Sequence, residues 1–124
     1  MNYNPVGWFE IAVNDIARAQ KFYETLFGVS MKREDSEGYE MAWFPSDMSV
    51  KGIPGALMKG YPYTPSASGT VVYFTCPDIN ATLTLGEHLG SKIILPKKSI
   101  GEYGTIAWLT DSEGNIIALH TVKK

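Results

Sequence analysis

The chain of 124 residues has little of what disulfide-bonded or membrane proteins contain. Its only cysteine is Cys76, so no disulfide can form within the chain. The N-terminus lacks the charged and then apolar layout of a secretory signal. No apolar run approaches the roughly 20 residues that span a bilayer. These absences predict a soluble, cytoplasmic protein without a membrane partner.

The sequence also lacks a large excess of positive or negative charge. The formal net charge is -2, and the basic pairs at 32–33, 97–98 and 123–124 are far apart in the chain. Such a charge distribution does not attract a phosphate backbone, so we expect no nucleic-acid partner. The composition itself is ordinary, 44% hydrophobic and 19% charged, which predicts one globular domain with a single core.

The chain contains an internal repeat of about 60 residues. The segment WFEIAVNDI at 8–16 returns as VVYFTCPDI at 71–79, and each copy is typical of a strand that leads into a helix. Two units of this size must share a core, because neither can bury its apolar faces alone. We therefore predict module 1 at about 6–60, a connector at about 61–69 and module 2 at about 70–121, with sites between the modules.

Alternation and capping residues predict the same element order in both modules. Phe9, Ile11 and Val13 alternate with Trp8, Glu10 and Ala12, and they should form the packing side of the first strand. Asp15 and Asp78 are suited to cap the two helices. The predicted elements are strand 6–13, helix from Asp15 to Gly28, strands 29–33, 39–44 and 55–59, then strand 70–76, helix from Asp78 to Gly90, and strands 92–95, 104–110 and 115–121.

Two local motifs carry a resemblance to a known family. The segment DIARAQKFY at 15–23 and the turn DSEGN at 111–115 resemble those of the glyoxalase/bleomycin resistance/dioxygenase family, also called the vicinal oxygen chelate superfamily. The similarity covers roughly residues 6–121. The segments at 8–11 and 97–104 look like those of a poorly characterised glyoxalase-like branch, which has no agreed reaction to carry over.

The resemblance implies an α+β fold. Two βαβββ modules would form a cupped mixed sheet, and the cup would hold a small molecule, often over a divalent metal. Many members are homodimers, so the resemblance also implies a homodimer.

The positions that usually ligate the metal are changed in this chain. By resemblance they fall at Trp8, at Val71 or Val72, at Ala118 and among residues 55–58. None of these side chains offers the carboxylate oxygen or imidazole nitrogen that such a cation needs. The resemblance therefore implies no metal at the usual family positions, which argues against an ordinary lactoylglutathione lyase and against an extradiol dioxygenase. A divalent metal at a displaced site stays open.

Two polar side chains are predicted to face the cup. Strand alternation places Glu10 on the side of Trp8, and His120 on the side of Ala118. Glu10 and His120 could hydrogen-bond each other or nearby backbone, anchor a ligand, or act as a catalytic acid/base pair or displaced metal site.

Aromatic residues are the other candidates for ligand binding. Trp8 and Tyr73 lie on the predicted cup side, where their rings could stack on a planar ligand. The pattern does not show which face of its strand Trp108 occupies, and it favours a position in the core. Glu102 and Tyr103 lie between two glycines, in a loop that could close over a ligand or form a plain turn.

The leading hypothesis is a homodimeric protein that binds a small, partly apolar or aromatic molecule in the cup between the modules. One alternative is a lyase- or isomerase-type metalloenzyme with a displaced site at Glu10 and His120. The other is a structural or regulatory dimer whose own side chains fill the cup. The sequence leaves open whether the protein is an enzyme, and it names no cofactor.

Overall fold

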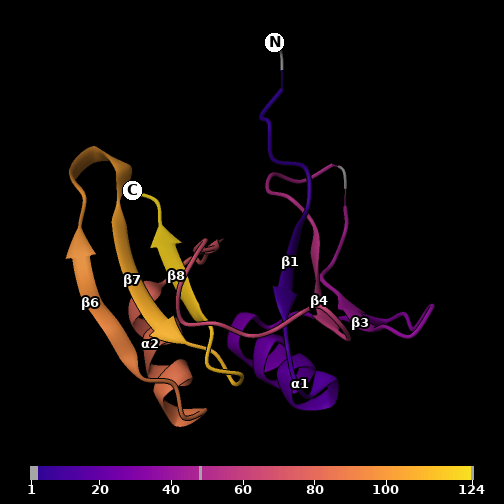
Figure 1. The fold of residues 1–124 in the computed structure, drawn as a ribbon. Coiled ribbons are helices and arrows are strands. Elements are labelled where there is room, and N and C mark those ends of the chain that lie inside the picture. The colour runs from indigo at the N-terminus through magenta and orange to yellow at the C-terminus, as the bar shows by residue number, and fades with distance from the viewer. Residues whose placement is uncertain (1–2, 48, 124) are drawn as a thin grey trace.

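The computed structural model describes residues 3–47 and 49–123, which form two modules with the same order of elements (Figure 1). Module 1 consists of β1 (Phe9–Ala12), α1 (Ile16–Phe27), β2 (Lys32–Arg33), β3 (Glu40–Trp43) and β4 (Gly55–Lys59). Module 2 consists of β5 (Tyr73–Thr75), α2 (Ile79–His88), β6 (Ile93–Ser99), the 3-10 helix η1 (Gly101–Tyr103), β7 (Thr105–Thr110) and β8 (Ile116–Thr121). Neither α-helix in these ranges has the length and apolarity to cross a bilayer.

Each module folds its four strands into one mixed sheet. The strand order is β1-β4-β3-β2 in module 1 and β5-β8-β7-β6 in module 2. In both sheets the first strand runs parallel to the last strand of its module, and the other neighbours are antiparallel. The predicted α+β fold of two βαβββ modules is confirmed.

Both helices begin where the capping aspartates indicate, and α1 also ends at the predicted glycine, whereas the C-cap of α2 is Leu89, one residue before the predicted Gly90. The Asp15 side chain accepts a hydrogen bond from the Arg18 backbone N–H at 3.0 Å. The helix α1 ends at Gly28, whose φ of 65° lies in the left-handed region that glycine adopts without strain. Asp78 caps α2 in the same way, accepting from the backbone N–H groups of Asn80 and Ala81.

One hydrophobic core draws on both modules. Ile11 and Val13 are buried in it, as the alternation predicts. The two helices contact each other, and each also packs against the sheet of its own module. Phe74 of β5 stacks on Phe27 of α1, with ring centroids 4.5 Å apart, and meets Phe9 of β1 edge-on at 5.9 Å. Separating the modules would expose these rings to water.

Several strands differ in length from the sequence prediction. The strands β1, β2 and β5 are shorter than predicted, and β6 is longer because it continues through Pro96 to Ser99. Proline cannot donate a ladder hydrogen bond, but an edge strand tolerates it. The strand β6 is an edge strand, and its register with β7 shifts between Ile93 and Leu95 and again between Leu95 and Lys98, the interval that contains Pro96.

Candidate functional site

The sheet of module 1 turns one face toward the core and leaves the other face open. The ladder register aligns Glu10 of β1, Ala56 of β4 and Trp43 of β3 across the open face. Glu10 and Trp43 are exposed, whereas Ala56 is fully buried. Because the small Ala56 lies between two larger side chains, the surface of this row is lowest at the central strand β4.

The open face of module 2 repeats this arrangement. Its register aligns Tyr73 of β5, Ala118 of β8 and Trp108 of β7. Trp108 Nε1 donates a hydrogen bond to the Tyr73 hydroxyl at 2.9 Å. Trp108 therefore lies on the open face, and the expectation that it packs in the core is wrong. Each module presents the same row of an edge residue, a buried alanine and a tryptophan.

Both carboxylate oxygens of Glu10 accept hydrogen bonds from aromatic side chains. Trp8 Nε1 donates to Oε2 at 3.3 Å, and the Tyr63 hydroxyl donates to Oε1. The hydrogen bond to Glu10 raises the pKa of Tyr63 to about 12, and burial adds to the rise. Tyr63 lies in the connector, where no hydrophobic periodicity singled it out, so the sequence analysis missed it.

The aromatic contacts continue on both sides of Glu10. Trp8 meets Trp43 edge-on, with ring centroids 5.5 Å apart and planes at 73°. Tyr63 meets Tyr39 edge-on at 5.8 Å and 87°. These five side chains, Trp8, Glu10, Tyr39, Trp43 and Tyr63, form one continuous series of contacts, here called the Glu10 cluster.

His120 lies on the open face of module 2 and has a different partner. Its Nε2 lies 2.5 Å from the backbone carbonyl oxygen of Tyr103, so this nitrogen acts as the donor. Glu10 and His120 belong to different sheets and share no hydrogen-bond partner. Their predicted roles as ligand anchors or as a catalytic pair stay predictions.

The β6–β7 loop is a tight turn. The Ile100 backbone N–H donates to the Gly104 carbonyl oxygen at 2.8 Å. Gly104 has φ 108°, and a side chain there would run into the backbone carbonyl of Thr121. Glu102 and Tyr103 are exposed on this turn. Whether they contact a ligand stays a prediction.

The family's usual metal positions do not fit a divalent cation in this fold. Ala56 and Ala118 face the open side at the centres of the two sheets, and Trp8 precedes β1. These side chains carry no oxygen or charged nitrogen donor. Within residues 3–47 and 49–123, no group of three or more His, Cys, Asp or Glu side chains is arranged to hold a metal ion. We therefore derive no chemistry through a metal.

Two pockets lie beside the open faces. One, of about 210 Å³, is lined by connector residues 66–71 together with Trp108 and Ile116. The other, of about 300 Å³, is lined by Gly7 and by residues 45–47 and 50–54 of the β3–β4 loop. Neither is lined by Glu10 or His120, so the predicted polar anchors lie outside both of these pockets.

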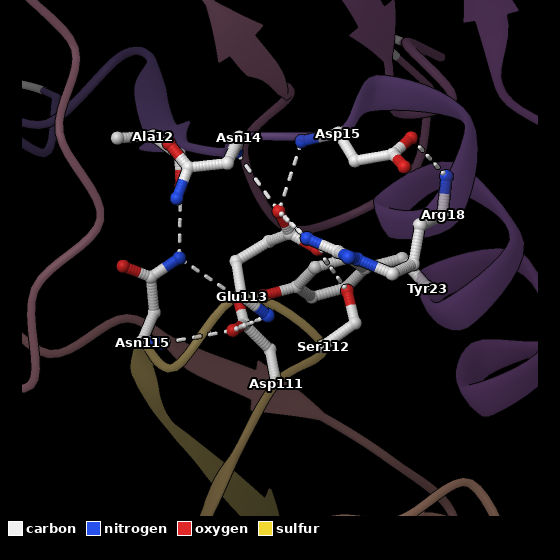
Figure 2. A network of polar contacts seen from close by, with 9 residues as sticks. All are labelled: Ala12, Asn14, Asp15, Arg18, Tyr23, Asp111, Ser112, Glu113 and Asn115. Atoms are coloured by element: carbon white, nitrogen blue, oxygen red, sulfur yellow. Dashed lines mark hydrogen bonds and ion pairs between the residues drawn. The ribbon is translucent and has the colours of Figure 1, made fainter.

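Figure 2 shows a polar network that joins the two modules through the turn between β7 and β8. The carboxylate of Glu113 accepts from the backbone N–H groups of Asn14 at 2.8 Å and Asp15 at 3.0 Å. The Arg18 guanidinium donates to it twice, at 2.8 and 2.9 Å. The side chain of Glu113 is fully buried, so these contacts dock the turn on the start of α1.

Two further residues of the same turn complete the network. Tyr23 of α1 donates to Asp111 Oδ2 at 2.6 Å, and burial raises the pKa of this tyrosine well above its usual range. Asn115 Nδ2 donates to the Ala12 carbonyl oxygen at 2.8 Å. The sequence analysis identified residues 111–115 as a turn that carries the family resemblance, and it assigned the turn no docking role. The available signal of docking was the two carboxylates and the amide at alternate positions of DSEGN.

Burial alone would raise the pKa of Glu113, but the network acts in the opposite direction and more strongly. The hydrogen bonds from Arg18, Ser112 and the two backbone N–H groups at the start of α1 lower the pKa of Glu113 from 4.5 to about 2. Glu113 is therefore charged at neutral pH. Its role in this geometry is to hold the modules together.

Comparisons with known proteins agree with this architecture. Residues 6–45 match the family model described as "Bleomycin resistance protein-like N-terminal". A search of curated proteins found no match. Among solved structures, TnmS3, described as an antibiotic binding protein from a Streptomyces species, has a TM-score of 0.71 at 21% identity, covering 99% of each chain.

Two further solved structures share the fold. A glyoxylase/bleomycin resistance protein/dioxygenase domain from a Frankia species has a TM-score of 0.69 at 13% identity, covering 98% of this chain and 100% of that one. A glyoxalase I variant from Zea mays has a TM-score of 0.70 at 23% identity, and the match covers 94% of this chain and 46% of that one.

The chain thus shares the fold of these solved structures, two βαβββ modules with open sheet faces. Its N-terminal third also matches a bleomycin resistance protein-like family model, in agreement with the resemblance stated from the sequence. The poorly characterised glyoxalase-like branch stays a prediction.

Proposed function

We propose that this protein binds a small, partly apolar or aromatic molecule against the open sheet faces. The observation that carries the proposal is the repeated row of an edge residue, a buried alanine and a tryptophan. Trp8, Trp43 and Tyr73 are 40%, 36% and 46% exposed on these faces. Exposed aromatic side chains on a sheet face, such as the pair of Trp8 and Trp43, are typical of a binding site.

The aromatic rings supply most of the binding energy in this proposal. Covering about 100 Å² of ring surface contributes about 2.5 kcal/mol, at roughly 25 cal/mol per Å². Trp8 and Tyr73 would stack on the ligand, and Glu10 and His120 would act as its polar anchors. The description of TnmS3 as an antibiotic binding protein supports a binding role for this fold.

The cup in this proposal is completed by a second copy of the chain in a cytoplasmic homodimer. Neither of the two pockets described above is lined by Glu10 or His120, and exposed aromatic side chains such as Trp8, Trp43 and Tyr73 are typical of interaction surfaces. Glu102 and Tyr103, exposed beside His120, would border the ligand from the β6–β7 turn.

The test is a titration with 1-naphthalenemethanol, a neutral planar probe, followed by ¹⁵N NMR of the three tryptophan indole N–H groups. We expect saturable shifts of the Trp8 and Trp43 signals. Trp43→Leu should weaken binding by about tenfold, equivalent to about 1.4 kcal/mol. Tyr61→Ala is the control, because Tyr61 is 91% exposed on the connector and lies outside the rows. No saturable shift in the wild-type protein would contradict the proposal.

A further inference from the structure

The Glu10 cluster surrounds a carboxylate with aromatic rings. Glu10 joins the edge-on pair of Trp8 and Trp43 to the edge-on pair of Tyr39 and Tyr63 through its two carboxylate oxygens. An edge-on pair presents its rings in two nearly perpendicular directions. The cluster therefore offers ring faces of several orientations around one negative charge.

Among residues 3–47 and 49–123, the negative charge of Glu10 has no cationic partner. Within the described residues, Glu10 forms no ion pair, and its two hydrogen-bond donors are the neutral groups of Trp8 and Tyr63. The basic side chains of the neighbouring strands are already paired with other acids. These pairs are Lys32 with Glu34 at 3.4 Å, Arg33 with Asp35 at 3.1 Å and Glu40 at 3.4 Å, and Lys59 with Glu40 at 3.1 Å.

The hydrogen bonds orient Glu10 without using all of its acceptor capacity. A carboxylate has about four lone-pair sites, and Trp8 and Tyr63 occupy one on each oxygen. The carboxylate is thus held in place by its neighbours and still has acceptor sites for a further donor. Such a group attracts a cation from solvent more than a neutral molecule.

We propose that the Glu10 cluster binds the cationic group of an organic amine or quaternary ammonium compound whose apolar body lies over the open face. This inference rests on the proposed function and adds the charge of the ligand to it. Cations are attracted to the faces of tryptophan and tyrosine rings, by about 0.5–2 kcal/mol depending on how far they are desolvated. The Glu10 carboxylate adds a direct charge attraction at the same place.

The corresponding place in module 2 lacks this combination. Tyr73 occupies the position of Glu10 in the repeated row, and its hydroxyl accepts from Trp108. The edge residue of that row is therefore neutral. The cation should therefore bind the open face of module 1. The open face of module 2 has the same row without the carboxylate, so it serves as the comparison within the same chain.

Two probes of nearly equal shape test the inference. (1-Naphthylmethyl)ammonium carries a positive charge at pH 7, whereas 1-naphthalenemethanol replaces the ammonium group with a hydroxyl group. We expect the ammonium probe to bind wild-type protein about tenfold tighter than the alcohol, measured by isothermal titration and by the indole N–H shifts. In Glu10→Gln this preference should fall to about twofold or less, because the charge is lost while the amide still offers an acceptor.

The control variant is Glu87→Gln, which removes the same charge from an exposed position on α2. It should keep the full preference for the ammonium probe, and melting temperatures of both variants establish that they are folded. Equal binding of the two probes to wild type, or an unchanged preference in Glu10→Gln, would overturn the cation inference and leave the proposed function standing. Failure of both probes to bind at millimolar concentration would overturn the proposed function itself.

Discussion

The two modules have the same topology but use their last β-turn differently. In module 2 the turn at 111–115 docks on the start of α1 through Glu113 (Figure 2). In module 1 the corresponding loop spans residues 44–54, and its described part makes no hydrogen bond to the start of α2. The start of α2 has the cap from Asp78 of its own module, as α1 has from Asp15, but no docked turn from the other module among the described residues. Only one of the two equivalent turns holds the modules together.

The open faces of the two modules also differ, in the charge of the residue at the edge of each row. Module 1 has a charged residue, Glu10, at the edge of its row and aromatic rings on either side. Module 2 has the neutral Tyr73 at the same position, with His120 in the neighbouring row. Module 2 thus contributes the polar turn that docks on the other module, whereas module 1 carries the charged residue on its open face.

The largest expected effect comes from breaking the contact that only module 2 makes. Glu113→Ala leaves two backbone N–H groups at the start of α1 without their acceptor and removes the partner of Arg18. We expect a loss of about 2–4 kcal/mol in the free energy of unfolding, measured by urea denaturation.

The matched control for Glu113→Ala is Asp47→Ala in the corresponding loop of module 1. Asp47 is exposed, and its hydrogen bonds go to the neighbouring Ser49. Its replacement should leave the urea midpoint nearly unchanged. Equal losses in the two variants would contradict the difference between the modules.

Acid should weaken the same contact. The pKa of Glu113 is about 2 in the folded protein, below its ordinary value of 4.5. A lowered pKa gives stability that is fully present above pH 4.5 and is lost as the pH falls toward 2. Melting temperatures of wild type and Glu113→Gln should therefore converge between pH about 4.5 and 2. A constant difference across this range would show that the charge of Glu113 does not stabilise the fold.

The smallest expected effect concerns divalent metals, which would bind through Glu10 if the displaced-site hypothesis were correct. Glu10 and His120 have separate hydrogen-bond partners in separate sheets. Because a ligand that binds the native state raises its melting temperature, we expect added Zn²⁺, Ni²⁺ or Mg²⁺ to leave the melting temperature of wild type unchanged. Glu10→Gln should behave identically. Stabilisation in wild type that is lost in Glu10→Gln would favour the metalloenzyme.

Part of the candidate site follows from the strand pattern alone. Alternation placed Trp8 and Glu10 away from the packing residues, and the structure has them on the side opposite the buried Ile11 and Val13. Alternation could not assign Trp108, because the face of a strand depends on its register with the partner strands. The pairing of Trp108 with Ala118 places it on the open face.

The sequence by itself determined the repeat and the two capped helices, because these depend on residues close together in the chain. Asp15 and Gly28 mark the ends of α1 through contacts within a few positions. The tertiary structure alone decided which distant groups meet. Tyr63 reaches Glu10 from a connector without periodicity, and Glu113 reaches Arg18 across 95 positions. Such contacts depend on how sheets, turns and connector pack together, which no local pattern specifies.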